Sequence, residues 1–211
     1  MRKFLPWLLT VGLVFLFRGS PMGWIFPMAL GTFLLREKLA RLLVRWPLWL
    51  AFPASGLVFG QLTECFAILQ NWNLPPDRKI LLHPNPLVDL LLGFFYYLLF
   101  ALTWYLLLRR VRFSKGAVFL ISGLFGLATE QGGAIVTGLL ASPVWGSLMA
   151  LFVMSVYGAF PALALLLSEA RFPERRRPAV WHYPLALFCL FVFWVVFGIG
   201  IYRPLISVFP K

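Results

Sequence analysis

The chain has 211 residues, of which 61% are hydrophobic and 12% are charged, and its mean hydropathy is +0.87. Soluble domains are about 45–50% apolar and about 25% charged, so this composition excludes an ordinary soluble domain and predicts a membrane protein. The formal net charge of +12 does not indicate a nucleic-acid-binding surface, because the Arg and Lys residues lie between the apolar runs, where they set the orientation of membrane spans.

The apolar runs have the length of membrane-spanning helices, since roughly twenty helical residues cross about 30 Å of hydrocarbon. We therefore predict an all-α, polytopic transmembrane helical bundle of about seven spans, forming one membrane domain over residues 1–211. The predicted spans are 4–17, 21–35, 47–69, 87–108, 117–140, 147–167 and 184–201. The first two are short, at about 21 Å each, and could form a re-entrant pair instead.

The connections between the spans carry most of the charge. Residues 36–45 form a predicted basic amphipathic turn at the membrane surface, and residues 71–86 contain four prolines that exclude a continuous helix. Over alternate connections, fourteen Arg and Lys residues fall on one side and five on the other. The positive-inside rule then predicts a cell-membrane protein with a cytoplasmic N-terminus and an extracytoplasmic C-terminus. If residues 4–35 crossed only once, the numbers would be twelve and seven, and the rest of the topology would be unchanged.

Two segments resemble each other at a constant offset of 66. Residues 58–64 (VFGQLTE) align with residues 124–130 (LFGLATE), and Gly, Thr and Glu coincide. Each segment carries small residues at helical spacing, which are Gly56, Gly60, Thr63 and Ala67 in the first and Ser122, Gly126, Thr129 and Gly133 in the second. These matches predict two parallel two-helix repeat units, 47–113 and 117–172. Chance similarity stays open as an alternative, because Gly, Phe and Leu are common in membrane helices.

The shared glutamates are the first candidates for a site. An acid inside a spanning helix costs about 2.5–3.5 kcal/mol on insertion scales, so it is usually turned inward and used. Glu64 lies about 27 Å along its helix from Trp46, and Glu130 about 20 Å from Ala117, which places both in the outer half of the membrane. Asp89 is expected at the same depth, because the predicted span 87–108 begins at the outer surface of the membrane and Asp89 lies near its start.

The residues around these acids complete the candidate site. The binding or protonation residues are Glu64, Glu130, Asp89, Gln61, Gln131, Thr63 and Thr129, and an outer gate above them comprises Arg78, Lys79 and His83. A structural alternative remains open, in which each acid is hydrogen-bonded to a neighbouring Thr, Gln or Trp and only holds helices together. The small-residue faces indicate close helix packing first.

Three classes of function fit such a site. Two carboxyl groups that approach closely share a proton, which suits passage or coupled transport of a cation or small solute. The same pair suits general acid and base catalysis, so the second hypothesis is a membrane-embedded hydrolase or transferase acting on a lipid-linked or peptide substrate, with Glu130 as base. The third is an accessory subunit, whose acids pair with basic residues of a membrane protein partner.

The sequence contains no sign of a metal site or a cofactor. The two histidines are expected on opposite sides of the membrane, and no His-x-x-x-His or Cys-x-x-Cys spacing occurs. We expect Cys65 and Cys189 to be buried free thiols, because both lie within apolar runs. The lipid bilayer is the partner that the composition predicts, and nucleic acid is not.

Overall fold

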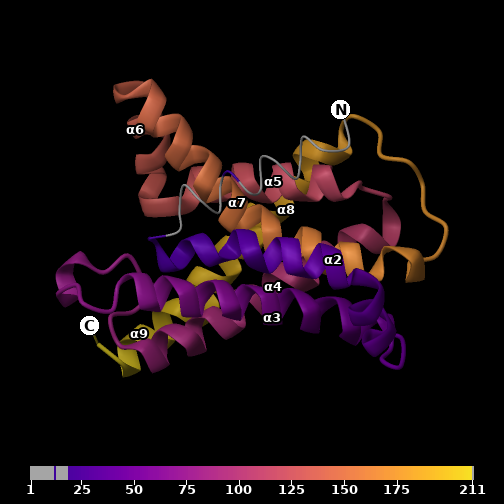
Figure 1. Cartoon of the computed structure of the whole chain (residues 1–211), viewed down its shortest axis with the longest axis horizontal. Helices are drawn as coiled ribbons and strands as arrows, with labels where there is room; N and C mark the ends of the chain where they lie inside the picture. Colours follow the sequence, from indigo (N-terminus) through magenta and orange to yellow (C-terminus); the bar gives the residue numbers. More distant parts are fainter. Residues whose placement is uncertain (1–11, 13–18, 211) are drawn as a thin grey trace.

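The computed structural model describes residue 12 and residues 19–210, and these fold as helices (Figure 1). The α-helices are α2 (Ile25–Leu43), α3 (Leu48–Gln70), α4 (Pro86–Arg110), α5 (Lys115–Thr129), α6 (Ala134–Ala141), α7 (Pro143–Ser168), α8 (His182–Phe197) and α9 (Arg203–Val208). Shorter helical turns are η1 (Pro21–Trp24), η2 (Pro76–Arg78), η3 (Glu130–Gly133), η4 (Glu169–Arg171) and a π-helical segment, η5 (Gly198–Tyr202). The described residues form no strand, apart from an isolated parallel bridge between Val111 and Arg176. The predicted all-α class is confirmed.

Five helical segments in the described part are long and apolar enough to cross a membrane. They are Leu48–Gln70, Pro86–Arg110, Lys115–Ala141, Pro143–Arg171 and His182–Val208. This finding is consistent with a multi-pass membrane protein, and the observed α3 and α4 match the predicted spans 47–69 and 87–108 to within two residues. The first predicted span, 4–17, lies outside the described residues, and the helix that contains the second, 21–35, is not among the five, so the predicted number of about seven is not confirmed.

The second predicted span is part of a longer helix. The sequence analysis ends it at residue 35 and places a surface turn at 36–45, but α2 continues to Leu43. Arg, Glu, Lys, Leu and Ala are strong helix formers, so the charged run extends the helix. The guanidinium of Arg171 then donates to the carbonyl oxygen of Leu43, the last residue of α2, and to that of Trp46 in the following turn.

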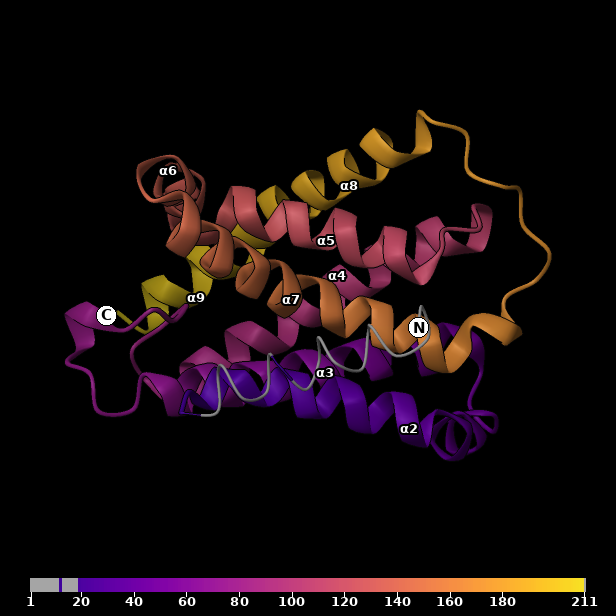
Figure 2. The same ribbon diagram turned by 45° about the horizontal axis from the view of Figure 1, so that its top comes forward.

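Helices α2, α3, α4, α5, α7 and α8 run in alternating directions along the bundle, and α9 continues the direction of α8 (Figures 1 and 2). One end of the bundle, here called the loop end, consists of residues 71–85 and 209–210, and the other, called the basic end, consists of residues 44–47, 111–114 and 172–181. Helix α3 packs against α4, and α5 packs against α7, while α2 and α3 both contact α7 and α8 contacts α4 and α5.

The core is aromatic and centred on α4. Phe100 has no exposed surface, and its ring contacts those of Phe125 on α5, Phe160 on α7 and Phe193 on α8. One turn later, the buried indole of Trp104 donates a 2.9 Å hydrogen bond to Ser122 on α5. One helix therefore fixes the positions of the three helices that surround it.

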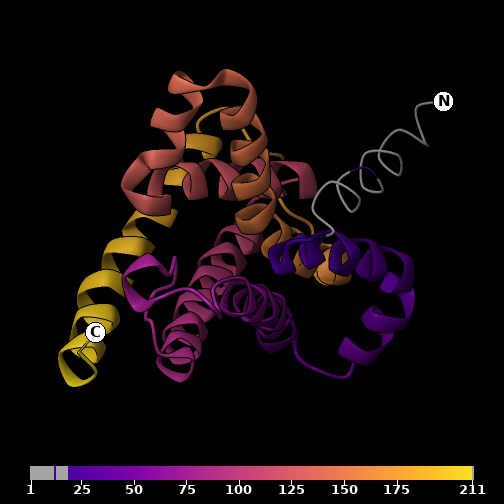
Figure 3. The ribbon, with the colours of Figure 1, turned by 60° about the vertical axis from the view of Figure 1, so that its left-hand side comes forward.

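The fifth predicted span, 117–140, is not one continuous helix. Helix α5 ends at Thr129, and α6 begins at Ala134 after a break in which Gln131, Gly132 and Gly133 have φ values of 49°, 64° and 87°. Two successive glycines accept this left-handed backbone without steric cost, which explains why the helix stops there. Helix α6 and the first turns of α7 extend beyond the rest of the bundle (Figure 3).

The last two predicted spans are also longer than expected. Helix α7 begins at Pro143, four residues before the predicted start at 147, because proline fits the first turn of a helix. The predicted span 184–201 extends through the π-helical segment and α9 to Val208. Cys65 and Cys189 are free thiols, but they are half-buried and not fully buried as predicted.

Candidate functional site

A glutamate and a tyrosine meet between α3 and α4. The hydroxyl group of Tyr97 donates a 2.7 Å hydrogen bond to Oε2 of Glu64, whose side chain is 8% exposed. The two helices approach closely because residue 60 is glycine: a Cβ atom there would lie 2.2 Å from Cγ of Tyr97. The tyrosine ring therefore packs over Gly60, and its hydroxyl group reaches the glutamate one helical turn further on.

The same arrangement occurs between α5 and α7. The hydroxyl group of Tyr157 donates a 2.5 Å hydrogen bond to Oε2 of Glu130, and a Cβ atom at Gly126 would lie 2.4 Å from the tyrosine ring. In both places glycine precedes glutamate by four residues. The two sites differ in access, because Glu130 is half-buried at the helix break whereas Glu64 lies inside an unbroken helix.

The predicted threonines do not contact the acids in this arrangement. Thr63 donates to the carbonyl oxygen of Phe59 at 2.9 Å, and Thr129 donates to that of Phe125 at the same distance. Each hydroxyl group is thus bonded to the preceding turn of its own helix, a usual role for threonine in a helix.

Asp89 joins the first pair. Its side chain has no exposed surface, Oδ1 accepts a 2.9 Å hydrogen bond from the backbone N–H of His83, and Oδ2 has no hydrogen-bond partner. The carboxyl groups of Asp89 and Glu64 interact electrostatically, although no direct hydrogen bond joins them. A hydrogen bond between two carboxyl groups would require a proton on one of them.

Gln61 adds a second unsatisfied acceptor to this region. Its amide nitrogen donates a 3.0 Å hydrogen bond to the carbonyl oxygen of Leu90, the residue after Asp89, and its Oε1 is buried without a partner. Buried acceptors without donors are uncommon and call for an explanation such as an ion or a proton. Gln131, in contrast, is exposed in the helix break and is not part of this buried group.

The two glutamate–tyrosine pairs influence each other electrostatically. The glutamates interact electrostatically with each other, and Tyr96 of α4 interacts with both. Neither glutamate, nor Asp89, has an Arg or Lys partner, because the ion pairs in the described residues are Arg36–Glu37 and Lys115–Glu169. Three acids, three phenols and an amide therefore form one polar cluster, which we call the acid cluster: Glu64, Glu130, Asp89, Tyr96, Tyr97, Tyr157 and Gln61.

Two of the three predicted gate residues, His83 and Lys79, make hydrogen bonds within the loop end. His83 is buried, its Nδ1 accepts a 3.0 Å hydrogen bond from the N–H of Asn85, and its Nε2 lies 3.2 Å from the carbonyl oxygen of Phe209. Lys79 donates to the carbonyl oxygen of Pro84 at 3.3 Å, and Arg78 is exposed. His83 thus connects the 71–85 loop to the chain after α9.

Tyr96, Tyr97 and Tyr157 are not predicted as site residues from the sequence. A signal for Tyr97 and Tyr157 exists, because Tyr-x-x-Phe occurs at 97–100 and again at 157–160, an offset of 60. No group of three or more His, Cys, Asp or Glu side chains that could hold a metal ion occurs within the described ranges.

The chain matches no protein-family model, no curated protein and no solved structure. The chemistry of the site is argued below from the residues of this chain.

Proposed function

We propose that this is a multi-pass cell-membrane protein that passes or couples the movement of a small cation, the simplest being a proton, through the acid cluster. The observation that supports the proposal is the pair of glutamates in apolar helices, each bonded to a tyrosine and neither paired with a basic residue among the described side chains. Acids at such positions are usually part of ion or proton pathways.

The Glu64–Asp89 pair is suited to hold the cation. The two carboxyl groups interact electrostatically, and Oδ2 of Asp89 and Oε1 of Gln61 are buried without a hydrogen-bond donor. A proton or a small cation bound between them would satisfy these oxygen atoms, since hard cations prefer oxygen ligands. The site would then alternate between a loaded and an empty state as the cation enters and leaves.

Glu130 is suited to be the point of entry. It is half-buried at a break between two helices, and broken helices line ion sites in transporters, where they offer free backbone groups. The hydroxyl groups of Tyr96, Tyr97 and Tyr157 belong to the same cluster, and a phenol can both donate and accept a hydrogen bond. They supply a chain of groups from Glu130 to Glu64.

The matching geometry also supports the proposed duplication of units 47–113 and 117–172. Each unit pairs a Gly–Glu helix with a tyrosine helix in the same way. The basic end is proposed to face the cytoplasm, because twelve Arg and Lys residues lie in it, in the adjoining ends of α4, α5 and η4, or in the C-terminal half of α2. Arg78, Lys79 and Arg203 lie toward the loop end.

Ion flux into liposomes tests the function. The purified protein is reconstituted, a potassium diffusion potential is applied, and proton entry is followed with an enclosed pH-sensitive dye, with sodium uptake as a parallel assay. We expect flux in the wild type and its loss in Glu64→Gln and Glu130→Gln. Glu169→Gln is the matched control, because Glu169 lies at the basic end outside the cluster. Wild-type liposomes that pass neither ion, or glutamine variants that pass ions normally, would refute the proposal.

The half-exposure of Glu130 keeps one alternative open. Its carboxyl group and the hydroxyl group of Tyr157 form an acid–base pair at the helix break, which a membrane-embedded hydrolase or transferase could use. That hypothesis assigns no role to the buried Glu64 and Asp89. Loss of ion flux in Glu64→Gln therefore favours transport, whereas a hydrolytic activity that depends on Glu130 alone favours the enzyme. Stable co-purification with a larger membrane protein would favour an accessory subunit.

A further inference from the structure

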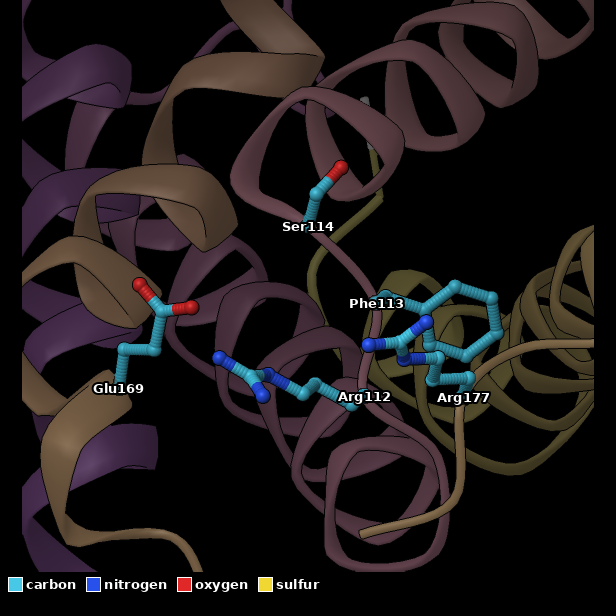
Figure 4. Close-up of a pocket in the computed structure, with 5 residues that line it drawn as sticks. All are labelled: Arg112, Phe113, Ser114, Glu169 and Arg177. Atoms are coloured by element: carbon cyan, nitrogen blue, oxygen red, sulfur yellow. The ribbon is translucent and has the colours of Figure 1, made fainter.

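A hollow lies at the basic end, far along the helices from the acid cluster. It has a volume of about 380 Å³ and is lined by Arg112, Phe113 and Ser114 between α4 and α5, Glu169 after α7, and Arg177 between α7 and α8. Figure 4 shows these five side chains around it. Three separate segments of the chain thus meet at one charged surface.

Backbone pairing brings the two arginines to the same place. The N–H of Arg112 donates a 2.9 Å hydrogen bond to the carbonyl oxygen of Arg176, beside the isolated bridge to Val111. Arg175 holds the same connection, because its guanidinium donates to the carbonyl oxygen of Leu108 at 3.0 Å and lies 4.6 Å from the ring centre of Phe172.

Arg175 is a structural residue here. Burial lowers the pKa of its guanidinium group, and its hydrogen bond and ring contact are made within the chain. It therefore fixes residues 175–177 against the end of α4 and leaves the next arginine, Arg177, at the hollow.

The lining of the hollow carries more positive than negative charge, with two arginines and one glutamate. Glu169, the acid in the lining, forms an ion pair with Lys115. Neither Arg112 nor Arg177 forms an ion pair or a side-chain hydrogen bond with any described residue, and both are exposed. Ser114 accepts from the N–H of Ala117 at 3.1 Å, which leaves its hydroxyl hydrogen available to donate. Two guanidinium groups and a hydroxyl group thus line the hollow as donors without acceptors.

The hollow lies at the depth of lipid headgroups if the bundle spans a membrane. Exposed tryptophans mark the level where an apolar core meets the headgroups, and Trp46, Trp49 and Trp181 are all exposed at this end. Basic pockets between helices at such a surface bind anionic lipid headgroups. Guanidinium groups bind phosphate oxygens in pairs, with directional bonds that an ammonium group does not match.

We propose that this hollow binds the phosphate group of an anionic phospholipid, with Arg112 and Arg177 holding the phosphate oxygens and Ser114 donating a further hydrogen bond. The proposal does not depend on cation passage. It requires only that the basic end lies at a membrane surface, and it predicts that the lipid joins the α4–α5 and α7–α8 connections.

Lipid binding to the full chain provides the test. The detergent-purified protein is titrated with phosphatidylglycerol and, separately, with phosphatidylcholine, and bound lipid is counted by native mass spectrometry. A parallel titration uses inorganic phosphate. Both lipids carry a phosphate group, but the choline cation neutralises its charge and is repelled by the two guanidinium groups. We therefore expect phosphatidylglycerol to bind at least about tenfold more tightly than phosphatidylcholine. Arg112→Gln with Arg177→Gln should abolish this preference.

A matched control distinguishes binding at the hollow from non-specific attraction of anionic lipid by surface charge. Arg41→Gln with Arg45→Gln removes the same charge from the second hollow at this end, lined by Lys38, Arg41, Leu42 and Arg45, and should keep the preference. Equal loss in both double variants would overturn the proposed site, and tight binding of inorganic phosphate without a lipid preference would overturn the lipid as its source. The charge-conserving Arg112→Lys variant should bind more weakly than the wild type, and unchanged binding would overturn the guanidinium contact.

Discussion

Gly60 lies directly against the ring of Tyr97, so closely that a Cβ atom at position 60 would be 2.2 Å from Cγ of that ring. The contact explains two features of the chain together. It lets α3 and α4 approach, and it aims the tyrosine hydroxyl group at Glu64, which lies one turn beyond the glycine. Gly126 and Tyr157 stand in the same relation to Glu130.

Alanine at either glycine should destabilise the protein. In Gly60→Ala and Gly126→Ala the added methyl group overlaps a ring held in the helix interface, and overpacking of this kind costs about 1–3 kcal/mol. Gly31→Ala in α2 is the control, because a Cβ atom there meets nothing within 4 Å and alanine favours the helix. Thermal unfolding in detergent should show a lower Tm for the first two variants and an unchanged or higher Tm for the third. Equal Tm values in all three would contradict the packing role.

Removing the two tyrosine hydroxyl groups should have unequal effects. Tyr97→Phe leaves a buried carboxyl oxygen of Glu64 without its donor, which costs about 1–3 kcal/mol. Tyr157→Phe acts on the half-buried Glu130, where water can replace the hydroxyl group, so we expect only about 0.5–1.5 kcal/mol. Thermal unfolding measured side by side for the two variants checks the order. A larger loss for Tyr157→Phe would show that the exposure of the two glutamates is not the deciding factor.

Replacing Asp89 by asparagine should destabilise the protein less than replacing it by alanine. Asp89→Asn keeps an oxygen atom for the N–H of His83, and its new N–H can donate to Glu64 in place of a proton between the carboxyl groups. Asp89→Ala removes both interactions and leaves the His83 N–H unsatisfied, at a cost of about 1–3 kcal/mol. We expect a Tm close to that of the wild type for the asparagine variant and a clearly lower Tm for the alanine variant. If both fall equally, Asp89 and Glu64 do not share a proton.

The sequence predicts what depends on composition and misses what depends on packing. Apolar runs locate α3 and α4 to within two residues, and the rarity of acids in such runs identifies Glu64 and Glu130. Tyr97 is not predicted, because tyrosine is ordinary in a membrane helix and its role depends on a glycine in another helix. The end of α2 is misplaced because charge indicates the membrane surface but does not end a helix.

The break after Glu130 is the other feature that the sequence analysis missed, since apolar residues continue on both sides of it. Two substitutions with opposite expected effects on stability test the backbone conformation of the break. Gln131 has a φ of 49°, which strains a residue with a side chain, whereas Gly132 adopts its φ of 64° freely. Gln131→Gly should therefore raise the free energy of unfolding by up to about 1 kcal/mol, although glycine also gives the unfolded chain more freedom. Gly132→Ala should lower it by about 1–2 kcal/mol.

The opposite signs of the two changes in the free energy of unfolding distinguish a broken helix from a continuous one. If α5 and α6 were one regular helix through residues 130–133, Gly132→Ala would stabilise it and Gln131→Gly would destabilise it, by about 0.5–1 kcal/mol each. The Tm of the two variants relative to the wild type decides between these cases. Glu130 follows the last residue of α5 at the break, where its carboxyl group is half-buried beside Tyr157. The same measurement therefore tests the backbone on which the proposed entry point of the cation depends.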